Sequence, residues 1–79
     1  MEKQGVFLLE RERLTERQQM VFQGIIDYQK LHVFAPSIRE LCEIVGAASP
    51  ATVYTHLQNL ERKGYILRKP ESSRAIVVL

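Results

Sequence analysis

The chain is 79 residues long and 46% hydrophobic, with 25% charged residues and a formal net charge of +2. This length holds one compact core and excludes two domains, and the composition is that of a soluble globular protein rather than of a disordered or fibrous one. The longest apolar run, Val6 to Leu9, is too short for a membrane span or a signal-peptide core, so we expect a cytoplasmic protein without a membrane partner.

Few residues could carry catalytic or metal chemistry. Cys42 is the single cysteine, and His32 and His56 are the two histidines, so neither an internal disulfide nor a metal site with a recognisable ligand spacing can form. No serine or cysteine nucleophile motif accompanies the histidines. We expect no cofactor, no metal and no small-molecule substrate, with Cys42 in the core, His56 at the edge of a packed face and His32 in a loop.

The basic residues are concentrated in the second part of the chain. Residues 1–48 carry six Lys/Arg against seven Asp/Glu, a balance of −1, whereas residues 49–79 carry five against two, a balance of +3. A local excess of positive charge is typical of surfaces that meet nucleic-acid phosphates.

Residues 1–13 are interpreted as an N-terminal extension, and a capping box predicts that the first helix begins after them. Thr15 and Gln18 stand three positions apart, so each side chain can bond a backbone N–H at the helix start. Val6 to Leu9, within the extension, either pack on the domain or form a small contact between two chains. The apolar positions that follow the box recur at helical spacing and fade near Leu31; they are Val21, Phe22, Ile25, Ile26 and Tyr28.

A second capping box, Ser37 with Glu40, predicts a short second helix. Gly46 suits the left-handed residue that commonly ends a helix, so this helix has about two turns. Its apolar positions are Ile38, Leu41, Cys42 and Val45.

A third helix follows after a tight turn. Ser49 and Pro50 suit the N-cap and the first helical position, and Gly64 marks the end after about Lys63. Residues 65–69 and 74–79 are β-prone and enclose a turn-like segment, so they read as a hairpin. The order predicts a mainly α (α+β) fold, a three-helix winged helix-turn-helix over residues 14–79 with the C-terminal β-hairpin as its wing.

The third helix has an apolar stripe and a polar stripe. At about 100° per residue, Val53, Leu57 and Leu60 share one side of the helix. The opposite side has no acidic residue in its first three turns and could enter a major groove, although an ordinary solvated face has the same pattern. The polar side and its flanks comprise Ala51, Thr52, Tyr54, Thr55, Gln58, Asn59 and Arg62.

Positive groups surround this helix. Ser49 and Pro50 place the N-terminus of this helix, whose unpaired backbone N–H groups could face a phosphate. The cations around its far end and the wing could each neutralise a phosphate or be solvated surface charges. They are Arg62, Lys63, Arg68, Lys69 and Arg74.

Six short segments within residues 14–79 carry a resemblance to a known family. They are Leu14 to Gln19, Ala35 to Glu40, Ser49 to Val53, His56-Leu57, Leu60 to Gly64 and Ser73 to Ile76. Together they resemble the DNA-binding domain of LexA, the repressor family of the bacterial DNA-damage (SOS) response, in its Gram-positive form.

The resemblance implies a transcriptional repressor of bacteria or phage, associated with the nucleoid, whose third helix enters the major groove of a palindromic double-stranded DNA operator. It implies that the base-facing positions are Ser49, Ala51, Thr52, Tyr54 and Thr55. The polar stripe adds Gln58 to this set. It also implies that the positions facing the DNA backbone are Arg17, Gln18, Arg62, Lys63, Ser73 and Arg74. The charge pattern adds Arg68 and Lys69 to this set.

Full-length members of this family continue into a dimerising, self-cleaving serine-lysine peptidase domain. This chain has no Ala-Gly dipeptide for such a cleavage, and we expect it not to be an enzyme. Because a single module binds DNA weakly, we expect that two copies of the chain can bind DNA as a homodimer. The alternative is a winged-helix protein-protein interaction module without DNA binding, which predicts no salt-dependent affinity for DNA.

Overall fold

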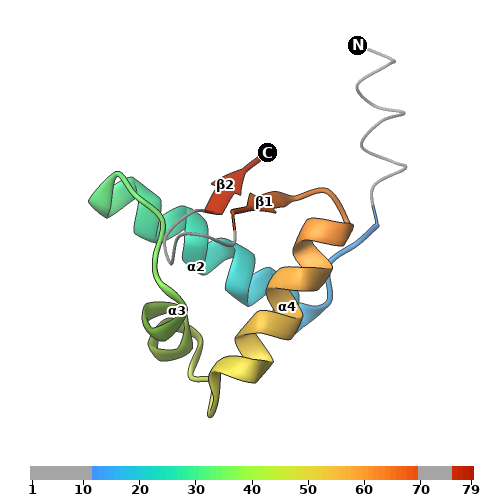
Figure 1. The fold of residues 1–79 in the computed structure, drawn as a ribbon, viewed down its shortest axis with the longest axis horizontal. Coiled ribbons are helices and arrows are strands. Elements are labelled where there is room, and N and C mark those ends of the chain that lie inside the picture. Colours follow the sequence, from blue (N-terminus) through green and yellow to red (C-terminus); the bar gives the residue numbers. More distant parts are fainter. Residues whose placement is uncertain (1–11, 70–75) are drawn as a thin grey trace.

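The computed structural model describes residues 12–69 and 76–79, and these residues form three helices and a two-stranded antiparallel sheet (Figure 1). The elements in chain order are α2 (Glu16–His32), α3 (Ile38–Val45), α4 (Pro50–Arg62), β1 (Ile66–Arg68) and β2 (Ile76–Val78). This order confirms the predicted winged helix-turn-helix. Val6 to Leu9 lie outside the described residues. Among the residues that the structure describes, no helix has the length and apolar character that a membrane crossing requires.

Both predicted capping boxes are formed. Thr15 Oγ1 accepts from the Gln18 N–H at 3.2 Å while Gln18 Oε1 accepts from the Thr15 N–H at 3.1 Å. Ser37 and Glu40 make the same reciprocal pair at 3.2 and 2.8 Å. These four bonds satisfy N–H groups that have no partner inside their own helices, and they fix where α2 and α3 begin.

The end of α2 differs from the sequence prediction. His32, expected in a loop, is the last helical residue, and its ring lies 4.1 Å from that of Tyr28, one turn earlier. This contact between neighbouring turns favours continuing the helix to His32. Val33 then ends α2 in the left-handed conformation, with φ at 71°, and donates its N–H to the Gln29 carbonyl.

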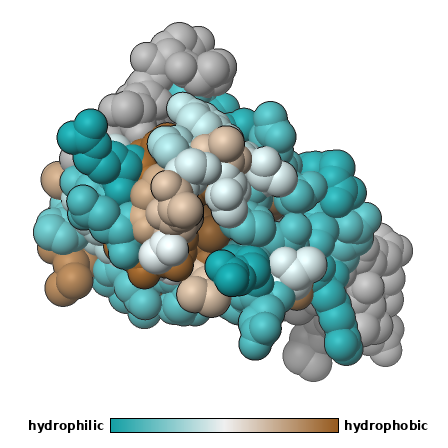
Figure 2. All heavy atoms as spheres, turned by 90° about the horizontal axis from the view of Figure 1, so that it is seen from below, coloured by the Kyte–Doolittle hydropathy of each residue, from teal (hydrophilic) through white to brown (hydrophobic). Residues whose placement is uncertain are grey.

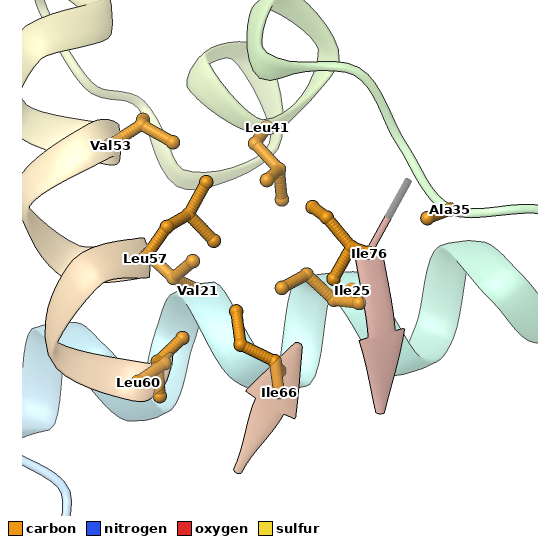
Figure 3. Packing of buried hydrophobic residues seen from close by; sticks show 9 residues of the cluster. All are labelled: Val21, Ile25, Ala35, Leu41, Val53, Leu57, Leu60, Ile66 and Ile76. Atoms are coloured by element: carbon orange, nitrogen blue, oxygen red, sulfur yellow. The ribbon is translucent and has the colours of Figure 1, made fainter. Parts of the chain in front are cut away.

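The core draws side chains from every helix and strand (Figure 3). Val53, Leu57 and Leu60 of α4 are each 0% exposed, which confirms the predicted apolar stripe. Cys42 is half-buried against the same cluster, as its place on the apolar face of α3 predicts. The remaining buried hydrophobic residues are Val21, Ile25, Ala35, Leu41, Ile66 and Ile76.

The first strand begins one residue later than predicted because the residue before it donates to the preceding helix. Tyr65 donates its N–H to the Leu60 carbonyl at the end of α4, so β1 begins at Ile66. Ile66 pairs with Val78, and Arg68 pairs with Ile76. The predicted turn of residues 70–73 lies outside the described residues.

Side chains of α2 and α4 attach the described part of the hairpin to the helices. Gln29 of α2 donates from Nε2 to the Ile76 carbonyl at 3.3 Å. Glu61 of α4 accepts from the Arg68 backbone N–H at 3.4 Å and from its guanidinium Nε at 3.3 Å. With Ile66 and Ile76 buried, these bonds hold both strands against the helical part of the domain.

Candidate nucleic-acid interface

A tight turn places the start of α4 directly after α3. Gly46 adopts φ 70°, which is accessible to glycine without the strain that a side chain brings, and the Ala47 N–H then donates to the Cys42 carbonyl at 2.9 Å. Ser49 is the extended N-cap of α4 and Pro50 its first residue. The two helices meet on the side of the molecule opposite the hairpin (Figure 1).

The outward side of α4 is exposed along its length. The burial of Val53, Leu57 and Leu60 fixes the rotation of the helix, so the residues on its other side face solvent. On the face that α3 and α4 share, hydrophilic and weakly polar side chains surround smaller apolar areas (Figure 2). All six residues expected to face bases are exposed: Ser49, Ala51, Thr52, Tyr54, Thr55 and Gln58.

The N-terminus of α4 differs from the other two helix starts. Ser49 makes no side-chain cap bond, whereas Thr15 and Ser37 both do. No acidic residue lies in the first turn of α4. The positive end of this helix, with its free N–H groups, can therefore receive an external anion such as a DNA phosphate.

The hydroxyl group of Thr55 is bonded within its own helix. Thr55 Oγ1 donates to the Ala51 carbonyl at 3.0 Å. A hydroxyl has one proton, so its capacity to donate is already used. The parts of this side chain left for another molecule are the methyl group and the lone pairs of Oγ1.

The cations expected to face the DNA backbone fall into two groups. Arg17 and Lys69 are exposed, and Arg62 is exposed but lies 3.5 Å from the Glu12 carboxylate, with both side chains 59% exposed. Such a pair is weak and can exchange with a phosphate. Arg68 is held more firmly by Glu61. Ser73 and Arg74 lie outside the described residues.

Gln18 and Lys63 are joined to each other. Gln18 is 6% exposed, and its Oε1 accepts both from the Thr15 N–H and from Lys63 Nζ, the latter at 2.8 Å. Lys63 Nζ also donates to the Arg13 carbonyl at 2.8 Å. The capping box turns the Gln18 side chain back toward the backbone, so Gln18 positions Lys63 and presents no free oxygen on the surface.

Arg17 borders the same part of the surface as the start of α4. A small cavity of about 10 Å³ lies between α2, the end of α3 and α4, and Nδ1 of His56 is buried beside it without a hydrogen-bond partner among the residues that the structure describes. The predicted place of His56, at the edge of the packed face, is confirmed by its partial burial. The cavity is lined by Arg17, Met20, Val21, Val45, Ala47, Thr52 and His56.

Sequence reasoning missed the segment that precedes α2. Glu12 pairs with Arg62, and its carbonyl accepts from the Tyr65 hydroxyl at 2.7 Å. The ring of Tyr65 in turn meets that of Phe22 edge-on at 5.3 Å. These partners lie about 50 positions apart in sequence, so no local pattern could have indicated them.

Helix α4 has one buried apolar side and one exposed polar side, a tight turn precedes it, and a hairpin follows it. This arrangement defines a winged helix-turn-helix of the DNA-binding class. The sequence model of the LexA DNA binding domain matches residues 11–75, and the chain belongs to this family.

Curated relatives agree with this assignment. The chain is 48% identical over 67 residues to a LexA repressor of Oceanobacillus iheyensis and 49% identical over 72 residues to one of Bacillus mycoides. It is 44% identical over 68 residues to a LexA repressor of Desulfatibacillum aliphaticivorans. These matches cover 85 to 86% of this chain but 32 to 34% of the relatives, so the chain spans about a third of their length.

Proposed function

We propose that this chain binds double-stranded DNA sequence-specifically, with α4 in the major groove of an operator, and that it serves a transcriptional repressor. The observation that carries the proposal is the outward face of α4. Its six exposed residues are small or hydrogen-bonding, and the helix has no acidic side chain before Glu61. Side chains of this kind can approach base edges without repelling phosphates.

Charge around this face supports the same placement. The free N-terminus of α4 and Arg17 are suited to phosphates at one end of the helix, Arg62 to phosphates at the other end, and Lys69, directly after β1, to phosphates beside the wing. Ser73 and Arg74 complete the proposed set of backbone contacts on the wing. Gln18, Lys63 and Arg68 act mainly by holding the first turn of α2 and the first strand in place.

We extend the proposal to the genes that the chain controls and to the number of copies that bind an operator. The relatives are named LexA repressors. We propose that this chain, encoded by a bacterium or a phage, likewise represses genes of the DNA-damage response in the bacterial cytoplasm. One module with few phosphate contacts binds weakly, so two copies on half-sites of a palindrome provide the affinity that repression needs.

A selection from random DNA duplexes tests this function. The purified chain is mixed with the duplexes at low and at moderate salt, and the retained duplexes are sequenced. We expect an enriched palindrome, whose half-site spacing reveals the arrangement of two copies. Retention of no duplex at either salt would instead favour a protein-interaction module, because DNA binding through phosphates must weaken as salt rises.

A further inference from the structure

We propose that α4 reads A·T base pairs through contacts between the methyl groups of Ala51 and Thr55 and the C5-methyl groups of thymines. This inference rests on the proposed DNA binding and adds the chemical class of the base pairs that the helix selects. It starts from the hydrogen bond of Thr55 to its own helix.

The Thr55 hydroxyl is turned toward the preceding turn. Its Oγ1 donates to the Ala51 carbonyl at 3.0 Å, and the residue is exposed. With Oγ1 held against the helix backbone, the Cγ2 methyl becomes the outer part of a side chain that rotates about one bond only. Thr55 therefore presents an apolar group to the groove and has no proton to donate there.

Ala51 adds a second methyl group in line with the first. Residues four apart lie on the same side of a helix, with Cβ atoms about 5 to 6 Å apart. Ala51 is exposed, and its side chain is a methyl group. The two methyl groups together span about one to two base-pair steps of B-DNA, at roughly 3.4 Å per step.

The major groove offers one partner for such groups. Thymine alone presents a methyl group there, whereas guanine presents two acceptors that are usually read by arginine or lysine. The outward side of α4 has no arginine or lysine before Arg62, which lies beside Glu12. Gln58 is exposed one turn after Thr55, and an amide is the side chain that pairs with adenine.

Replacement of thymine by uracil tests the inference, because it removes only the methyl group of the base. Each thymine of a selected duplex is replaced in turn, and the affinity is measured by fluorescence anisotropy. For the unmodified chain we expect at least one position at which uracil weakens binding about fourfold, the factor that burial of one methyl group contributes. Uracil outside the half-sites serves as the control and should change nothing.

Two variants assign the contact to the methyl group of Thr55. Thr55→Val keeps the methyl group and removes the hydroxyl, so it should retain the loss on uracil substitution. Thr55→Ser keeps the hydroxyl and removes the methyl group, so it should bind the thymine duplex about fourfold more weakly and become indifferent to uracil at the thymine that Thr55 contacts, while any loss at a thymine that Ala51 contacts remains. Urea unfolding of both variants checks that the exposed substitution leaves the fold intact.

The opposite pattern, with Thr55→Ser discriminating like the unmodified chain and Thr55→Val indifferent, would overturn the inference. If a duplex is selected but uracil has no effect at any position, the inference fails while DNA binding stands. If no duplex is selected, both the inference and the proposed function fail.

Discussion

Val33 occupies a backbone conformation that its side chain opposes. It is 92% exposed and has φ at 71°, the left-handed region in which a β-branched residue is strained. Little packing compensates for the strain, because nearly the whole residue faces solvent. The position requires the geometry of a helix C-cap, which glycine adopts most readily.

We predict that Val33→Gly raises the free energy of unfolding by about 1 kcal/mol, since the relief of strain exceeds the added flexibility of the unfolded chain. Urea denaturation measures the change. Leu31→Gly is the control, because Leu31 is also exposed but lies inside α2, where glycine should lower stability by about 1 kcal/mol. Equal losses for both variants would refute the strain at Val33.

Two serine N-caps should respond differently to the same substitution. Ser37 accepts from the Glu40 N–H, whereas Ser49 makes no cap bond. We predict that Ser37→Ala costs about 1 kcal/mol of stability, while Ser49→Ala changes stability by less than ~0.5 kcal/mol.

In DNA binding the order of the two serines should be reversed. Ser49→Ala should weaken binding to a selected duplex by a factor of about three to ten, the value of one hydrogen bond, and Ser37→Ala should leave the affinity of the folded chain nearly unchanged. Equal affinities for the Ser49→Ala and unmodified chains would remove Ser49 from the interface.

At the scale of the element, α4 separates folding from recognition by its two sides. We predict that Thr55→Glu abolishes binding to a selected duplex, because it adds a negative charge on the side proposed to enter the groove between the phosphates, and changes the free energy of unfolding by less than ~0.5 kcal/mol. Anisotropy and urea denaturation measure the two effects. Thr55→Gln introduces a side chain of the same size as glutamate but without its charge, so this variant should keep the salt-dependent, sequence-independent part of the affinity. If Thr55→Gln also lost all affinity for DNA, the effect of Thr55→Glu would be due to size rather than charge.

The end of α4 is tied to the segment that precedes α2. Glu12 faces Arg62, a proposed phosphate contact, across 3.5 Å. We predict that Glu12→Gln increases the affinity for duplex DNA by a factor of about two to five at low salt, because it releases Arg62 from a pair of that strength.

The control for this effect is Asp27→Asn, which changes the net charge equally. Asp27 is exposed in the second half of α2, where its carboxylate accepts a hydrogen bond from the Gln23 side chain at 3.0 Å. An equal gain in affinity for both variants would show that net charge, not the release of Arg62, is responsible.

The elements were predictable where their signals are local. The two capping boxes, Gly46 and the stripe of Val53, Leu57 and Leu60 each depend on residues within a few positions of one another, and the structure confirms all of them. The end of α2 was not predictable, because Val33 is a residue that disfavours the conformation it adopts.

The candidate site was predictable in its exposure but not in its bonding. Periodicity alone predicts that Thr55 faces outward, whereas the direction of its hydroxyl requires the rotamer. The link from Lys63 to Gln18 and the pairing of Arg62 with Glu12 join residues 45 and 50 positions apart, beyond any local pattern.

At the scale of the whole molecule, the proposed DNA surface and the end of α2 lie apart. The outward side of α4 and Arg17 form the proposed surface, whereas the end of α2 carries a cluster of Tyr28, His32 and Phe34 at a different edge of the domain (Figure 1). Leu31 and Val33 beside this cluster are 80% and 92% exposed, so they can report on binding at that edge.

Amide chemical-shift mapping with a selected duplex tests the central claim, that the outward side of α4 meets DNA. In a chain of 79 residues, each backbone N–H can be followed during the titration. We predict that the largest changes fall on the first turns of α4 and at Arg17, with small changes at Leu31 and Val33. Changes confined to the end of α2, with α4 unaffected, would contradict the account.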